Sequence, residues 1–387
     1  MKKNMIKLAA GAAAILLMST SAHAGYTMKK KVGDQDTKFT LFGFSQIVAG
    51  TGEGYIKDNS DEAVRFGADR IRLGWKYSSG NVRGKVFLDF NQPSDKQEDV
   101  GMYRVIKDAF ISYIINYGII IKAGVIKTPV GMGFTIPGWN LDVIKRGFDK
   151  KLAFERGNGL MISGRAIGGS GKVNGFEMGH ERPWKGLGYD IMVANQTTRS
   201  GAVVESTDAG VDEDDRGNAY MGRLHFDYTE LLHTEVSYGV SPEAGGTEGS
   251  EDYEVLNVGL DSHFLDGMNF KAEYYDVSGI KGAKHEMSTL AITYTAYLTD
   301  SLEFALKSIN GTEDEAGTER DVGNHYVGFN YYPNLITTKK NRGSKRKNNQ
   351  HTIKVNYVSA TGDSETFKGA GGVYKDDVVL AMYQFKF

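Results

Sequence analysis

Two neighbouring stretches of the sequence place cations and apolar side chains on alternate positions. The first covers residues 64–77 and the second covers residues 82–90. In an extended chain, successive side chains point to opposite faces, so the charged residues of each stretch share one face. The cations are Arg70, Arg72, Lys76, Arg83 and Lys85. A wall of guanidinium and ammonium groups attracts anions, so the spacing predicts a surface that guides or binds anionic solutes.

Two further segments are rich in cations. The connection 128–158 is too long for a plain hairpin, and loops of that length are usually functional. It contains Lys145, Arg146, Lys150, Lys151 and Arg156. The segment 334–350 contains no acidic residue and includes Lys345, Arg346 and Lys347. We expect the first segment to fold inward and the second to lie at a pore mouth. In the competing interpretation, Arg and Asp side chains neutralise one another and only stiffen the wall.

Other motifs point away from catalysis. The chain has no Cys, so a disulfide scaffold and a Cys-ligated metal are excluded. The string 166–173 resembles a phosphate-binding loop but ends on Val173 where Ser or Thr is required. His180-Glu181 and His285-Glu286 lack the second histidine of a zinc helix and are expected at the surface or in turns. The sequence therefore predicts no enzyme activity, no metal and no cofactor.

Stretches with a period of two dominate the chain after residue 24. Alternating stretches are separated by breaks rich in Gly, Asp, Asn and Ser, with 49 Gly in 387 residues. The predicted strands lie near 38–49, 64–77, 82–91, 104–116, 118–127, 157–166, 186–195, 218–228, 233–241, 252–263, 268–277, 285–297, 300–308, 322–332, 350–358 and 376–387. Sixteen long strands with alternating short and long connections are typical of a transmembrane β-barrel, although a soluble all-β sandwich is an alternative.

The ends of the chain support export to a membrane. Residues 1–24 combine a basic start, an 11-residue apolar stretch and a small-x-small site, which is the pattern of a cleaved signal peptide. We expect residues 25–37 to form a periplasmic lead-in. Residues 38–387 would form a sixteen-stranded antiparallel β-barrel with an inward constriction loop near 128–158. The final strand ends on Phe387 and resembles the terminal signal of bacterial outer-membrane barrels.

The sequence also resembles the phosphate-selective porin O/P-like family of outer-membrane porins. The resembling segments are DRIRLGWK (69–76), KVFLDF (85–90), IKDAFISY (106–113), KAGVIKTPVGM (122–132), LAFERG (152–157), VGFNYYPN (327–334) and KVNYV (354–358). The resemblance implies a trimeric channel narrowed by its third loop. The connection between Asn334 and Thr352 is longer than the tight turn of that family.

These observations predict an outer-membrane porin, expected as a homotrimer, for passive diffusion of small hydrophilic solutes, with an anion preference that extends to phosphate. Its other expected contacts are membrane lipid and lipopolysaccharide. The acidic run 212–215 could bridge divalent cations to lipopolysaccharide, but a solvated surface run is the simpler interpretation. An exported acidic chain argues against nucleic-acid binding. The alternatives are a barrel that sheathes or anchors a partner protein and a barrel enzyme such as a phospholipase.

Overall fold

The computed structural model describes residues 25–51, 64–91, 105–116, 118–168, 185–195, 217–229, 231–242, 251–263, 265–280, 283–333, 350–363, 374 and 376–387. Among these residues, no helix is both long and apolar enough to cross a bilayer. The signal peptide expected at 1–24 lies outside the described residues.

Strands form nearly all of the described chain. In order they are β1 (Tyr26–Val32), β2 (Gln35–Thr51), β3 (Arg65–Ser79), β4 (Val82–Asp89), β5 (Ile106–Asn116), β6 (Ile119–Lys127), β7 (Arg156–Gly168), β8 (Lys185–Asn195), β9 (Asn218–Tyr228), β10 (Leu232–Ser241), β11 (Tyr253–Ser262), β12 (Met268–Ser278), β13 (His285–Tyr297), β14 (Leu302–Glu315), β15 (Thr318–Tyr331), β16 (His351–Gly362) and β17 (Val378–Lys386). Short helical turns α2 (Met132–Thr135), η4 (Gly138–Asn140) and α3 (Asp149–Leu152) interrupt the connection between β6 and β7.

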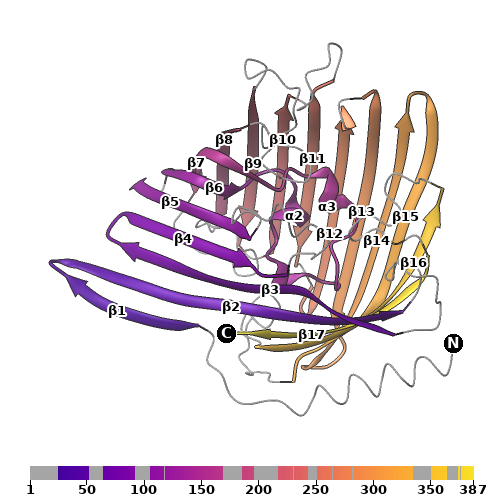
Figure 1. The fold of residues 1–387 in the computed structure, drawn as a ribbon, viewed down its shortest axis with the longest axis horizontal. Helices are drawn as coiled ribbons and strands as arrows, with labels where there is room; N and C mark the ends of the chain where they lie inside the picture. Colours follow the sequence, from indigo (N-terminus) through magenta and orange to yellow (C-terminus); the bar gives the residue numbers. More distant parts are fainter. Residues whose placement is uncertain are drawn as a thin grey trace, which may run out of the picture.

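Strands β2 to β17 close into a sixteen-stranded antiparallel barrel. Each pairs with its neighbours in sequence, and β17 pairs with β2 to close the ring (Figure 1). Full closure leaves no unpaired strand edge in the ring, which an isolated sheet could not achieve. The predicted fold class and all sixteen predicted strands are therefore confirmed, with ends that differ by up to seven residues.

Two local features differ from the sequence expectation. The long connection expected at 309–321 is a tight turn, because β14 and β15 extend to Glu315 and Thr318. Ala316 and Gly317 form this turn with φ of 54° and 84°. Two positive φ values give the twist that a two-residue hairpin needs, and they can be adopted by residues other than Asn-Gly. The prediction of a long loop from the composition of this segment was therefore wrong, because the segment forms a hairpin.

The expected lead-in at 25–37 contains strand β1. This strand pairs with the first half of β2, from Tyr26 opposite Leu41 to Val32 opposite Gln35. The second half of β2 pairs with β17, and Phe387 and Gly43 exchange backbone hydrogen bonds of 3.0 Å. Strands β1 and β17, at the two ends of the described chain, therefore pair with successive parts of β2. The β1–β2 hairpin projects from the barrel (Figure 1).

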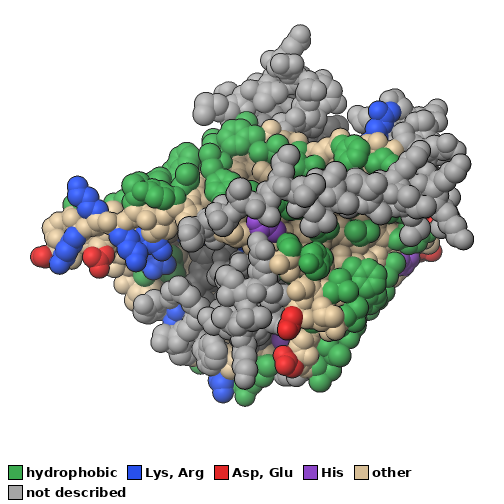
Figure 2. Space-filling view, turned by 90° about the horizontal axis from the view of Figure 1, so that it is seen from below, with side chains coloured by type: hydrophobic (Ala, Val, Ile, Leu, Met, Phe, Trp, Pro, Cys, Tyr) green, Lys and Arg blue, Asp and Glu red, His purple; other side chains and the backbone are tan. Residues whose placement is uncertain are grey.

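The barrel is apolar outside and polar inside. On β9, Leu224 and Phe226 are 58% and 39% exposed, whereas His225 between them is 1% exposed. The same alternation recurs on the other strands, and hydrophobic side chains gather on the outer surface (Figure 2). Such a distribution is the reverse of that in a water-soluble protein and suits strands surrounded by lipid.

The outward orientation of Leu73 on β3 gives a stability prediction. Its side chain shares a face with Ile71 and Tyr77, which are 39% and 42% exposed. Leu73→Arg should lower the free energy of unfolding in lipid vesicles by about 2–4 kcal/mol if the residue lies near the bilayer midplane. Leu73→Ala is the control, because it removes packing without adding charge. Equal losses for the two variants would show that this face does not meet lipid.

Candidate solute site in the barrel interior

The connection 128–155 lies inside the barrel and packs against its β10–β17 side. Its apolar residues Val130, Val143, Ile144, Phe148 and Leu152 are at most 1% exposed. They belong to one hydrophobic cluster with inward residues of the wall, including Tyr253, Tyr275, Met287, Ile309, Tyr326 and Leu380. The helical turns α2 and α3 therefore lie within the ring of strands (Figure 1). This apolar patch inside an otherwise polar lumen is the surface that receives the connection.

Close approach to the wall requires glycine at the start of the connection. Gly131 has a φ of 89°, and a Cβ at this position would lie 2.3 Å from the Tyr275 hydroxyl. The Gly131 amide donates to Ser237 Oγ at 3.2 Å, and the Gly133 amide donates to Glu273 at 2.9 Å. These hydrogen bonds hold the backbone of the connection against β10 and β12. A larger residue at position 131 would push the backbone away from the wall.

Polar side chains of the wall hold the rest of the connection. Gln46 donates to the Gly138 carbonyl at 3.1 Å, and Asn330 donates to the Asp142 carbonyl at 2.9 Å. The Ile144 amide donates to Asn356 Oδ1 at 2.8 Å. Lys354 and Lys307 donate to the Leu141 and Arg146 carbonyls. Because buried backbone groups need such partners, the inner wall and the connection form one hydrogen-bonded unit.

A cavity of about 700 Å³ remains between the connection and the β2–β9 side of the barrel. Among the described residues, thirteen Lys and Arg side chains line it, against four carboxylates from Asp36, Asp108, Glu155 and Asp190. The cations are Lys38, Arg70, Arg72, Lys76, Arg83, Lys85, Lys107, Lys122, Lys127, Arg146, Lys150, Arg156 and Arg223. The interior therefore has two unlike sides, an apolar side that holds the connection and a basic side that faces the cavity.

Part of the basic side is neutralised by ion pairs. Arg72 donates to Asp89 at 2.8 Å, and Asp108 bridges Lys85 at 2.6 Å and Arg156 at 3.0 Å. Such pairs stiffen the wall, as the competing interpretation of the sequence holds. Lys38 and Arg83 line the cavity without an ion pair to any described carboxylate. Ion pairing therefore accounts for part of the wall, and the action of the remaining cations on an anion stays a prediction.

Arg146 and Glu155 of the connection have shifted pKa values. Burial lowers the pKa of Arg146 to about 9, and the nearby cations Arg70 and Arg72 act in the same direction. For Glu155, burial favours the neutral acid, but Lys150 at 2.5 Å and Arg156 outweigh it and lower the pKa to about 2. The stabilisation from ionised Glu155 is fully present above its ordinary pKa and is lost as the pH falls through about 2. Arg146 stays charged at neutral pH.

The structure brings most of the predicted cations together. Eight of them line the cavity: Arg70, Arg72, Lys76, Arg83, Lys85, Arg146, Lys150 and Arg156. Lys145 binds Asp69 instead and borders a separate cavity of about 40 Å³. The Lys151 side chain and the segment with Lys345, Arg346 and Lys347 lie outside the described residues. The action of all these cations on a solute remains a prediction.

Five cavity cations were missed by sequence reasoning. They are Lys38, Lys107, Lys122, Lys127 and Arg223. Lys122 is a lone cation in the apolar run 119–126, which indicates a buried strand rather than a lumen wall. Ile120 and Gly124, two positions before and after Lys122, lie on the same face of the strand. Because these neighbours are not polar, only the barrel geometry shows that this face points inward. Arg223 does alternate with apolar residues in the sequence, and that pattern could have assigned it.

No protein-family model matches the sequence, and no curated protein matches it. Solved structures do match. The outer membrane channel DcaP of Acinetobacter baumannii superposes with a TM-score of 0.59 at 16% identity, covering 94% of this chain and 100% of that one. An anion-selective porin from Comamonas acidovorans gives 0.59 at 14% identity, covering 91% and 100%. The trimer form of OmpT, an outer membrane protein of Vibrio cholerae, gives 0.58 at 10% identity, covering 91% and 99%. The chain therefore has the fold of outer-membrane porins over nearly its whole described length.

Proposed function

We propose that this protein is an outer-membrane porin through which small hydrophilic solutes diffuse passively, with preference for anions. One observation carries the proposal: an interior cavity lined by thirteen cations and four carboxylates lies within a barrel whose outer surface is apolar. The apolar surface needs lipid, and sixteen strands leave room for an aqueous lumen. The similarity to an anion-selective porin supports the same assignment.

Anion preference follows from the excess of cations. Within a narrow lumen, fixed charges raise the local concentration of counter-ions, with a reach of about 8 Å at physiological ionic strength. Phosphate belongs to the proposed solute class, because guanidinium groups match its oxygens in a bidentate geometry. Arg70, Arg72 and Arg146 border the cavity from β3 and from the connection, so a passing oxyanion would meet guanidinium groups from two sides.

Orientation and assembly are part of the proposal. Short turns of such barrels face the periplasm, and we propose that the β3–β4 turn and the basic segment 334–350 lie on that side. There the cations of the segment would concentrate anions at the mouth. A homotrimer is proposed by analogy with the trimer form of OmpT. Export through a cleaved leader at 1–24 and contact with lipopolysaccharide complete the proposal.

Planar-bilayer electrophysiology tests this function. The purified protein should form channels, and its reversal potential in a tenfold KCl gradient should have the sign of Cl⁻ preference, within the ideal limit of about 59 mV. Added phosphate should reduce the KCl current if phosphate occupies the cationic wall. Cation-selective channels would contradict the anion preference. Absence of conductance until a co-purifying protein is removed would favour a sheathing barrel, and turnover of phospholipid by the pure protein would favour an enzyme.

A further inference from the structure

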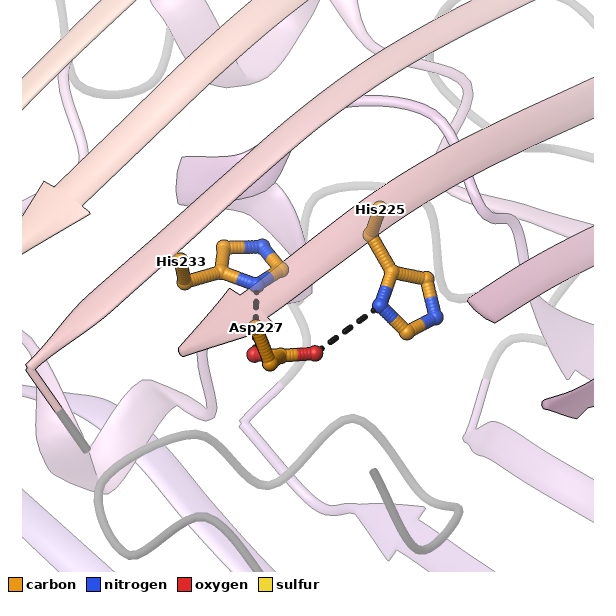
Figure 3. Close-up of side chains that lie close together, drawn as sticks. All are labelled: His225, Asp227 and His233. Carbon is orange, nitrogen blue, oxygen red and sulfur yellow. Dashed lines mark hydrogen bonds and ion pairs between the residues drawn. The ribbon is translucent and has the colours of Figure 1, made fainter. Parts of the chain in front are cut away.

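A buried cluster of two histidines and a carboxylate lies on the inner face of β9 and β10, next to the turn that joins them. His225 and Asp227 share one face of β9, and His233 is the direct cross-strand partner of Asp227. The two imidazoles flank the carboxylate (Figure 3). All three side chains are at most 1% exposed. Their potential ligand atoms lie within 4.8 Å of one another.

The hydrogen-bond geometry of His233 limits the states the cluster can adopt. Nδ1 of His233 lies 2.9 Å from Asp227 Oδ1, and Nε2 lies 2.9 Å from Glu235 Oε2. A neutral imidazole has one N–H, so it can donate to only one of these carboxylates. The other nitrogen then presents a lone pair toward a carboxylate oxygen, which is repulsive. Either a second proton or a metal ion must lie between these atoms.

The surrounding charges favour a bound cation. Arg223 contacts Asp190 at 2.5 Å and Glu235 at 3.4 Å, so one positive charge is shared by two carboxylates. Asp227 and the neighbouring Asp261 of β11 add two more, and His233 is the cross-strand partner of Asp261. Lys122 interacts electrostatically with Asp190, and Lys271 and His263 interact with Asp261. Negative charge therefore gathers around the two imidazoles.

The neighbouring strand leaves room for the His225 ring. Gly188 of β8 is the cross-strand partner of His225, and a Cβ at that position would lie 2.3 Å from His225 Cε1. A glycine here allows the imidazole to rotate, and imidazole rotation about χ2 is soft. On the other side, His225 Nδ1 lies 3.0 Å from Asp227 Oδ2. The two Nδ1 atoms contact different oxygens of the Asp227 carboxylate, so binding of a shared ion requires rotation of the rings over a short distance.

We propose that His225 Nδ1, His233 Nδ1 and an Asp227 oxygen bind a divalent transition metal ion of the zinc class. Two imidazoles and one carboxylate suit such an ion, whereas Mg²⁺ and Ca²⁺ prefer oxygen ligands. A water molecule would complete the tetrahedral coordination. Glu235 is a positioning residue: it accepts the Nε2 proton of His233 and thereby keeps Nδ1 free for the metal. The ion would link β9 to β10 close to their turn and stabilise the folded barrel by mass action.

Metal titration of the full folded barrel, purified without a histidine tag and treated with chelator, tests the site. One equivalent of Co²⁺ should give the visible absorption of a tetrahedral complex, and Zn²⁺ should displace it and raise the thermal unfolding temperature. Asp227→Asn and His233→Gln should weaken the affinity for Co²⁺ at least tenfold. Glu235→Gln should retain the tetrahedral spectrum but weaken the affinity by about 10–100-fold, as expected for loss of an outer hydrogen-bond partner.

His285→Gln is the matched control, because His285 is also buried in the wall and its Nε2 contacts Glu313 at 2.6 Å. It should bind Co²⁺ as the parent does. Heat-modifiable migration on gels confirms that each variant is folded, and His225→Gln provides a second ligand variant if His233→Gln does not fold. The proposal fails if the parent shows no stoichiometric binding or if the folded ligand variants bind as the parent does. Protons on both nitrogens of His233 in the presence of Zn²⁺ would establish an imidazolium in place of the metal.

Discussion

Removal of residues 138–150 from the interior connection should raise the single-channel conductance by roughly twofold or more, because a sixteen-stranded barrel without an internal segment leaves an open aqueous channel. The variant replaces Gly138–Lys150 with a short glycine bridge. This segment includes η4 and the buried Val143, Ile144 and Phe148. Without it, the connection would keep only its two ends in the lumen, residues 128–137 with α2 and residues 151–155.

The barrel should survive this change because its strand pairing does not involve the segment. Wall groups such as Asn330 and Asn356 lose hydrogen bonds to the connection, at a net cost of about 0.5–1.5 kcal/mol each, but the widened lumen gives them water. The control replaces the same residues with an equal length of Gly and Ser, which keeps the chain in the lumen but removes its packing. An unchanged conductance in the bridged variant would mean that the channel is limited elsewhere.

The strand count and the orientation of the strands could be predicted from sequence because they depend on a local period of two. Arg72 and Leu73 differ in chemistry and must face opposite sides, so lumen and lipid follow directly. β14 and β15 show the limit of this reasoning. Their outer ends contain Glu313, Asp314 and Glu319, which suggest a loop by composition, yet cross-strand pairing continues through them to the turn at Ala316.

The interior site depends on contacts that the sequence pattern does not contain. The apolar residues of the connection, such as Phe148, reveal their partners only when strands β11 to β17 curve around them. His285 shows the same difficulty: expected at the surface or in a turn, it is a buried partner of Glu313 in the β13–β14 wall. The histidine cluster also escaped sequence reasoning, because His225 and His233 meet across a hairpin rather than along a helix.

Reversing two unpaired cations of the cavity should reduce anion selectivity. In the double variant Lys38→Glu/Arg83→Glu, the cavity would have eleven cations and six carboxylates in place of thirteen and four. The excess of positive charge would fall by nearly half, so the reversal potential in a KCl gradient should shift toward the cation side without changing sign. The shift should be larger at 0.1 M than at 1 M salt, because the Debye length falls from about 10 Å to about 3 Å.

These two positions suit the test because neither forms an ion pair with a described carboxylate, so reversal removes no such contact. Arg72→Glu would instead place a carboxylate beside Asp89. A change in ion selectivity could then not be separated from a loss of stability. The control is Lys30→Glu/Lys284→Glu, which makes the same change in net charge at residues that do not line the cavity. Both control residues are exposed and neither forms an ion pair with a described carboxylate, so little stability is lost there. If both double variants shifted the reversal potential equally, selectivity would follow the net charge of the protein and the basic wall would have no special role.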